Sequence, residues 1–312
     1  DSLLGGSPGH PGVCLNRGST PAPRKDQPLG SALRVNLSMS EEIVNTCRQL
    51  GFTPLTSELI TTFAQHRSGR KAHRVTTNAN SVVKVRCLSE EWRVERLCRM
   101  RNSTAGVRLS PMLARRGRVM VEDWIQGHTL DHFPSEDDTL RKAASLLARL
   151  HSCRVDDSPP GSGISPELVQ ERLDWLRHRA ILEQSQLRAL ESVFENSSAW
   201  RGQRGLIHGD FCGENLVQDV DGEVWSVDNE NLDLDFLDYD VGLSWYRWPL
   251  PPEQWKGFLN YYERFSQRTV SDLDFWKAVA VVKGLYFHST LGAKGVDFPK
   301  SRLTAFLNEG TL

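Results

Sequence analysis

The sequence predicts an α+β fold of two lobes: a small antiparallel β lobe with one helix, then a larger, mainly helical lobe. Between residues 57 and 122, short β-branched runs alternate with polar turns, a pattern typical of antiparallel strands. After Gly127 the apolar residues recur at helical spacing instead. We therefore expect a leader at residues 1–38, an N-lobe at 39–126 and a C-lobe at 127–312.

The leader, residues 1–38, is rich in Gly, Pro and Ser and has no apolar periodicity. Such a segment cannot bury enough surface to offset its ordering entropy, so we expect it to be disordered. The first methionine is Met39, and a helix is expected to open directly after it, at Ser40. One hypothesis is that Met39 is the natural start; a native flexible tail or a processed precursor are the alternatives.

In the N-lobe, the β-branched run from Ser81 to Val85 is the clearest strand. Ser89 is expected to cap a helix that runs to Met100. A hairpin around Gly117 completes the sheet. The strands expected here cover residues 57–63, 73–77, 81–85, 108–113 and 118–122.

The C-lobe is expected to consist mainly of amphipathic helices, two of them forming a helical hairpin. A mixed patch at 206–227 interrupts them, with a hairpin turn at Asp221-Gly222. Because ligands tend to bind between lobes, we expect the functional site near this patch. The helices expected here cover residues 140–150, 166–178, 182–194, 253–265 and 273–287.

The composition is that of an ordinary globular protein, with 39% hydrophobic and 25% charged residues among 312. The net charge of −1 gives no reason to expect binding to nucleic acid or membranes. No apolar run has the length of a membrane span. The six cysteines are scattered without metal-binding spacing, which favours reduced thiols in a cytoplasmic protein. Monomer and homodimer remain equally open.

The most informative segment is the run His208–Asn215, in which an Asp is followed five positions later by an Asn. A strand ending at Asp228 comes next. Phosphoryl transfer from ATP requires such a set: Asp210 accepts the proton of the attacking hydroxyl, while Asn215 and Asp228 hold magnesium. Glu230 ranks below Asp228 as a metal ligand. Taken alone, Asp210 would favour a loop Asp in turn hydrogen bonds; the alternative for Asn215 is a cap or turn residue, and for Asp228 a strand-end turn.

Lys84 interrupts the strand run Val82–Val85, and side chains alternate along a strand. Lys84 is therefore expected on the opposite face from its apolar neighbours, where it reaches the α and β phosphates. Such a lysine is normally positioned by a carboxylate of the next helix; Glu91 is the first choice, before Glu95 and Glu90. A solvated strand lysine is the alternative.

A polar loop between two expected strands contains Ser68 and Gly69. Its backbone amides are candidates for covering the phosphates of a nucleotide. The loop has neither a G-x-G-x-x-G nor a Walker A pattern, so a basic surface turn is an equal alternative.

These motifs resemble those of the aminoglycoside phosphotransferase and choline kinase-like family. The resemblance extends over roughly residues 55 to 290 and is carried by residues 206–215, 227–228, 239–240, 82–85 and 147–151. It implies a protein-kinase-like two-lobed fold, ATP as cofactor with GTP possible, Mg²⁺, and a small-molecule hydroxyl acceptor.

The resemblance also implies roles for further residues. Backbone groups of Asp123, Trp124 and Ile125 would meet adenine at the hinge. Asp240 would brace the catalytic loop through hydrogen bonds to its backbone, with structural support from His208. Two departures are notable: Asn229 stands where the family usually has an aromatic residue, and the candidate phosphate loop is short of glycines.

Two features argue against a protein kinase. Gly209 stands where protein kinases have Arg, and the gap from Asp228 to Asp240 leaves no room for a long activation segment.

Three carboxylates, Asp233, Asp235 and Asp238, follow the expected metal site closely. As possible acceptor-binding residues they favour a cationic acceptor, and a solvated acidic loop is the alternative. An antibiotic such as an aminoglycoside, and hence antibiotic resistance, is the first expectation. A metabolic kinase of choline, ethanolamine, an amino acid or a sugar comes second, and a catalytically silent nucleotide-binding module is the alternative from another class.

Overall fold

The computed structural model describes residues 39–60, 70–131, 136–155, 163–195, 198–291 and 296–309. The expected leader at 1–38 and the candidate phosphate-loop residues Ser68 and Gly69 lie outside this described part. An antiparallel five-stranded sheet forms its N-terminal portion, with the strand order β1-β2-β3-β5-β4. The strands are β1 (Pro54–Leu59), β2 (Lys71–Thr77), β3 (Val82–Cys87), β4 (Met112–Arg116) and β5 (Val119–Asp123).

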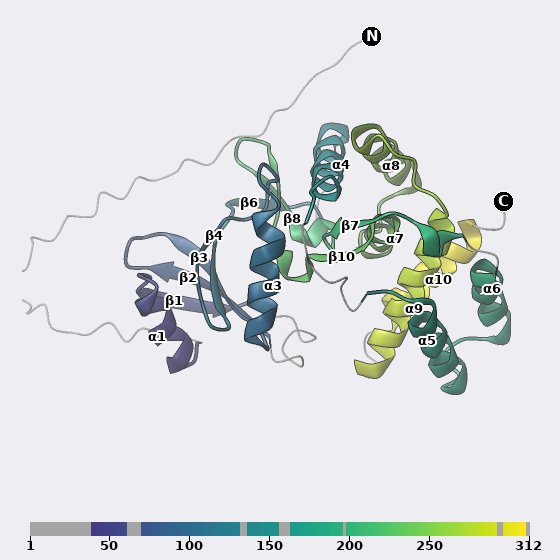
Figure 1. Cartoon of the computed structure of the whole chain (residues 1–312), viewed down its shortest axis with the longest axis horizontal. Coiled ribbons are helices and arrows are strands. Elements are labelled where there is room, and N and C mark those ends of the chain that lie inside the picture. The colour runs from purple at the N-terminus through teal and green to yellow at the C-terminus, as the bar shows by residue number, and fades with distance from the viewer. Residues whose placement is uncertain are drawn as a thin grey trace, which may run out of the picture. The chain divides into compact units, whose positions relative to one another are not determined.

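The helices α1 (Glu41–Gln49) and α3 (Glu91–Asn102) flank this sheet (Figure 1). Along β5, Val119 and Val121 join the apolar cluster that contains α1, whereas Met120 joins the larger core that contains α3. This alternation follows from the pleat of a strand. Since Val83 and Val85 also belong to the α1 cluster, Lys84 between them faces the α3 side.

Two smaller sheets flank the run His208–Asn215, which lies between β7 (Arg204–Ile207) and β8 (Leu216–Asp219). β6 (Gly127–Thr129), β8 and β9 (Val224–Ser226) form a three-stranded sheet, and β7 pairs with β10 (Asp233–Phe236). The predicted turn between β8 and β9 contains Gly222, whose φ of 75° suits glycine.

The remaining elements are helices with one shared core. α4 packs against α8, and α9 contacts α5, α6, α7 and α10. Within the described residues no helix is both long and apolar enough to cross a membrane. The helices are α4 (Asp137–His151), α5 (Pro166–His178), α6 (Gln184–Glu195), α7 (Leu237–Arg247), α8 (Pro252–Ser266), α9 (Leu273–Leu291) and α10 (Asp297–Glu309).

The predicted α+β class is confirmed, with two local corrections. Helix α3 begins at Glu91 with Glu90 at the N-cap position, so Ser89 is not its cap. The segment after Asn231, for which an acidic loop was an alternative, forms β10 and the start of α7. The strand alternates acidic with apolar residues, which is the period of a strand rather than of a loop.

Candidate active site

A cavity of about 650 Å³ brings together Asp210, Asn215 and Asp228, the three residues on which the predicted chemistry rests. Asp210 follows β7, Asn215 lies in a short 3-10 turn that leads into β8, and Asp228 follows β9. Rigid strands therefore hold each of the loops that carry them. The cavity extends from this point to side chains of α5, α7 and α9.

The predicted catalytic loop, residues 208–215, is fixed at its base by Asp240, which is fully buried near the start of α7. Its carboxylate accepts hydrogen bonds from the backbone N–H of His208 at 2.7 Å and of Gly209 at 2.9 Å. Gly209 has a φ of 75°, and a Cβ there would lie 2.6 Å from the carbonyl oxygen of Asn231. Glycine is therefore required for both the backbone conformation and the close approach.

His151 of α4 supports Asp240 from the other side, with Nε2 at 3.1 Å from its carboxylate. Burial alone would raise the pKa of Asp240, but the hydrogen bonds from His151 and from the backbone N–H of His208 lower it overall. Asp240 is therefore an ionised buried carboxylate that orients the loop.

The Asp210 carboxylate is held by two side chains. Asn215 Nδ2 donates to Asp210 Oδ2 at 3.0 Å and to its carbonyl oxygen at 2.8 Å. Arg247 Nε, from the end of α7, donates to Asp210 Oδ1 at 2.7 Å, and its Nη2 lies 3.3 Å from Glu214. Sequence reasoning missed Arg247, because only the fold brings the far end of α7 back to the loop.

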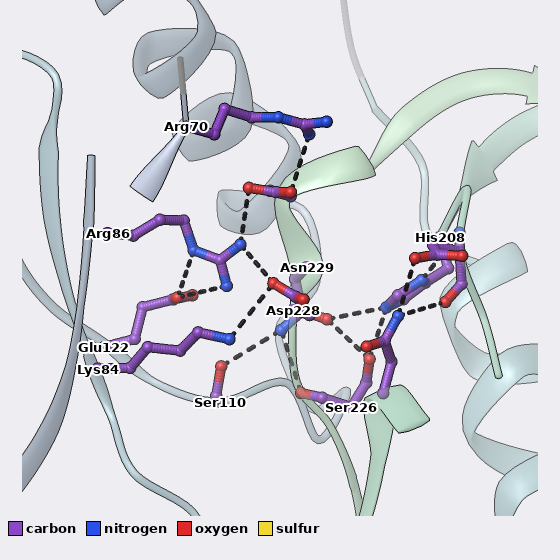
Figure 2. A network of polar contacts seen from close by, with 12 residues as sticks. Arg70, Lys84, Arg86, Ser110, Glu122, His208, Ser226, Asp228 and Asn229 are labelled. Carbon is purple, nitrogen blue, oxygen red and sulfur yellow. Dashed lines mark hydrogen bonds and ion pairs between the residues drawn. The ribbon is translucent and has the colours of Figure 1, made fainter. Parts of the chain in front are cut away.

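Asp228 is the focus of a group of charges between the sheet and the catalytic loop (Figure 2). Lys84 Nζ donates to Asp228 Oδ1 at 3.3 Å, and Arg86 Nη1 lies 2.5 Å from the same oxygen. Burial would raise the pKa of Asp228, but Arg86 and Lys84 more than offset this and hold it far below its usual range. Asp228 has left-handed backbone angles (φ 61°, ψ 40°), an uncommon conformation that is often found at functional sites.

Arg86, which the sequence analysis did not single out, is almost completely buried beside Lys84. Its Nη2 lies 3.1 Å from Glu122 on the neighbouring strand β5, and its Nη1 lies 2.8 Å from Glu230. Arg70 reaches the other Glu230 oxygen at 2.8 Å. A signal was present in the sequence: Arg86 lies two residues after Lys84 in β3 and therefore points to the same face.

The predicted pairing of Lys84 with Glu91 needs correction. Glu91 is the exposed first residue of α3, as Glu90 and Glu95 are exposed around it, and the structure pairs Lys84 with Asp228 instead. The carboxylate on this face of the sheet comes from β5. Glu122 lies between Arg86 and the α3 residue Arg101, whose Nη1 is at 2.5 Å. Helix α3 thus supplies the cation, Arg101, and strand β5 supplies the carboxylate, Glu122.

The residues at the metal position fit Mg²⁺. Magnesium prefers hard oxygen ligands and needs few from the protein. Asp228 supplies a carboxylate that its cationic neighbours keep ionised. Both hydrogen bonds of Asn215 to Asp210 use its amide nitrogen, which leaves the amide oxygen for a metal. The described residues contain no group of three or more His, Cys, Asp and Glu that could hold a metal ion.

Asn229, the departure from the family pattern, is fully buried in a polar network (Figure 2). Its Oδ1 accepts from Ser226 Oγ at 2.7 Å and lies 3.2 Å from His208 Nε2, and its Nδ2 donates to Ser110 Oγ at 3.3 Å. His208 Nδ1 accepts from the backbone N–H of Asp210 at 3.2 Å, so the proton of a neutral ring lies on Nε2. The polar neighbours thus satisfy the buried amide of Asn229.

The three predicted hinge residues, Asp123, Trp124 and Ile125, are not among the residues that line the cavity. The backbone N–H of Asp123, at the end of β5, already donates to Pro111 O at 2.8 Å. Trp124 stacks with Arg74, whose Cζ is 5.2 Å from the ring centroid, and Ile125 follows it. Adenine binding by this segment remains a prediction.

The three carboxylates proposed for the acceptor have partners within the chain. Asp233 forms an ion pair with Arg96, and Asp238 is buried at 2.6 Å from Arg268. Asp235 accepts from the backbone N–H groups of Ile164 at 3.0 Å and of Phe236 at 2.9 Å. Only Asp233 and Asp235 line the cavity. They do not form one acidic surface.

Comparison with known proteins agrees with this geometry. The pattern of the phosphotransferase enzyme family matches residues 106–277, more than half of the chain. A search of curated proteins returns no match.

Several solved structures share the fold. Choline kinase LicA from Streptococcus pneumoniae has a TM-score of 0.64 at 16% identity, over 86% of this chain and 97% of its own. Macrolide 2′-phosphotransferase MphH from Brachybacterium faecium has a TM-score of 0.61 at 11% identity, over 86% of this chain and 98% of its own. Spectinomycin phosphotransferase APH(9)-Ia, solved with ADP and spectinomycin, has a TM-score of 0.62 at 10% identity, over 86% of this chain and 94% of its own.

Proposed function

Because the chain belongs to the phosphotransferase enzyme family, we propose that it transfers the γ-phosphate of ATP to a hydroxyl of a small molecule, with Mg²⁺ as cofactor. The observation that carries the proposal is the meeting of Asp210, Asn215 and Asp228 in one cavity. A catalytically silent nucleotide-binding module would not need all three.

In the proposed reaction, Asp210 accepts the proton of the attacking hydroxyl. Arg247 and Asn215 hold its two carboxylate oxygens, so that the base meets the acceptor in one orientation. Asn215 and Asp228 would hold Mg²⁺, which when bound neutralises charge on the triphosphate. Lys84 and Arg86 add positive charge at Asp228, and preorganised charge of this kind is usually the largest contribution to catalysis.

The acceptor belongs to one of two classes in this proposal. Likeness to the macrolide and spectinomycin phosphotransferases favours an antibiotic, including the aminoglycosides expected from sequence. Likeness to choline kinase favours a metabolic alcohol such as choline, ethanolamine, an amino acid or a sugar. Neither likeness identifies the acceptor, since identities this low indicate the fold alone.

The test is acceptor-dependent release of ADP or GDP from MgATP or MgGTP by the purified protein. The acceptor panel contains aminoglycosides, macrolides, amino alcohols, hydroxy acids, sugars and sugar phosphates, with the Asp210→Ala variant as the blank. Release that requires both an acceptor and Asp210 supports the proposal. Nucleotide binding with no release above the blank would replace it with the silent module.

A further inference from the structure

One end of the cavity, away from the metal position, lies between α5 and α9. Three of its polar side chains, those of Arg172, Tyr246 and Lys283, are hydrogen-bond donors, and the Asp235 carboxylate lies beside them at the backbone of Ile164. This end, called the basic end below, is lined by Ile164, Leu168, Arg172, Tyr246, Lys283 and Phe287.

Arg172 projects from α5 and has unused hydrogen-bonding capacity. Its Nε and Nη1 atoms are buried and have no hydrogen-bond partner in the part of the chain that the structure describes. Its guanidinium carbon lies 5.6 Å from the centroid of the Tyr286 ring. Burial lowers the pKa of Arg172, and the carboxylate that acts on it is that of Glu171, its neighbour in α5. Buried donors of this kind are usually satisfied, so their geometry indicates a missing acceptor group.

Lys283 and Tyr246 complete the donor set of the basic end. Lys283 Nζ donates to the buried Tyr239 hydroxyl at 2.6 Å, and among the described residues it has no carboxylate partner. The Tyr246 hydroxyl is buried without a hydrogen-bond partner in the same part of the chain. Gly284 of α9 makes room for it, since a Cβ at Gly284 would overlap this hydroxyl.

The carboxylates of the cavity do not neutralise this end. Asp233 is paired with Arg96, and Asp235 accepts two backbone hydrogen bonds. Asp210 is paired with Arg247. Asp235 keeps its negative charge here, but Arg172 and Lys283 together bring two positive charges, so the charge presented to a bound molecule is positive, and the N–H and O–H donors without partners favour a ligand with oxygen acceptors.

We propose that the acceptor is a hydroxyl compound that carries an oxyanion, a carboxylate or a phosphate, which binds to Arg172, Tyr246 and Lys283. This inference rests on the proposed function and specifies its substrate class. It places the anionic group at the basic end while a hydroxyl of the same molecule meets Asp210. Polycations such as aminoglycosides are disfavoured, because they would be repelled by Arg172 and Lys283.

The experiment measures binding separately from turnover. Calorimetry on the wild-type protein with MgADP gives the Kd of hydroxy acids, sugar phosphates, amino alcohols, aminoglycosides and neutral sugars. The hydroxy acid and sugar phosphate arms distinguish a carboxylate from a phosphate. ADP release with the same compounds and MgATP is measured in parallel, so that the acceptor class and the catalytic activity are judged by different data.

Arg172→Gln is the decisive variant, and Arg177→Gln is its matched control on the same helix, where Arg177 is exposed and pairs with Asp174 and Glu191. Loss of one charge-assisted hydrogen bond predicts a Kd for the oxyanion compound raised about 10- to 100-fold in Arg172→Gln. Arg172→Lys should recover part of the affinity, and Arg177→Gln should match the wild type. Unchanged binding of MgADP shows that the variants are folded.

The inference is overturned if only cationic or neutral compounds bind, if no oxyanion compound of the panel binds, or if Arg172→Gln leaves the oxyanion Kd unchanged. Oxyanion binding that depends on Arg172 without any Asp210-dependent ADP release would contradict the proposed kinase activity while supporting the ligand class.

Discussion

Asp210 is held from two directions, since Arg247 contacts one carboxylate oxygen and Asn215 the other. Burial lowers the pKa of Arg247, but Asp210 more than offsets this and raises it, so the guanidinium stays charged. A charged partner at 2.7 Å fixes the rotamer of the base before any acceptor arrives. We interpret Arg247 as a positioning residue.

Replacing Arg247 by Gln tests this role. Because a misplaced base loses near-attack geometry, kcat is expected to fall about 10- to 100-fold, with a smaller change in the KM for ATP. Arg247→Lys keeps the charge but not the planar geometry and should recover activity only in part. Steady-state kinetics separate the two constants, and a kcat equal to that of the wild type would exclude a positioning role.

At the scale of elements, the loop after β9 joins the catalytic loop to the rest of the fold through Asn229. Its amide connects Ser226 and His208 with Ser110, which precedes β4. The network is fully buried. Each polar group left without a partner at such a site costs about 1–3 kcal/mol.

The variant Asn229→Leu removes this amide while nearly keeping its volume. The free energy of unfolding is expected to fall by about 2–4 kcal/mol, because His208 and Ser226 lose an acceptor and Ser110 a donor. Urea denaturation measures the change. Asn45→Leu in α1, at an exposed position, is the control. A loss no larger than in this control would show that the network does not stabilise the fold.

The sequence was informative where local patterns decide the structure. The helix at 166–178 was predicted with its bounds, since Ser165 and Pro166 mark its start. Asp210, Asn215 and Asp228 were singled out from their spacing, and the structure brings them to one cavity. Their partners were not predicted. The contacts of Arg247, Glu122 and Arg86 depend on how distant elements pack. The partners of Asp233, Asp235 and Asp238 could not be predicted for the same reason, since Arg96, Ile164 and Arg268 lie on distant elements.

For the whole molecule, buried carboxylates determine the response to acid. For Glu122, Asp228 and Asp240, burial would raise the pKa, but neighbouring cations or hydrogen bonds lower it overall. A carboxylate with a lowered pKa in the folded state stabilises the fold above its unfolded pKa and loses this contribution as the pH falls through the folded value.

The free energy of unfolding should therefore decrease below about pH 4, the ordinary carboxyl pKa, after an earlier loss that begins at about pH 6.5, because burial lowers the pKa of His73 and His288. Urea titrations across this range provide the measurement. In Asp240→Asn the decrease should be shallower, because one of the ionised groups is missing. Stability that increases as the pH drops below about 4 would contradict the assignment of these groups as ionised.

The central claim is that Asp210 is the base of a phosphotransferase reaction, and the most direct test is the kcat of Asp210→Asn with the identified acceptor and MgATP. Glu214→Gln is the matched control, an acidic residue of the same loop that also contacts Arg247. We predict a loss of about 10²–10⁴-fold for Asp210→Asn, the range of general-base catalysis, and a change within about tenfold for Glu214→Gln. Turnover near the wild-type value in Asp210→Asn would contradict the account.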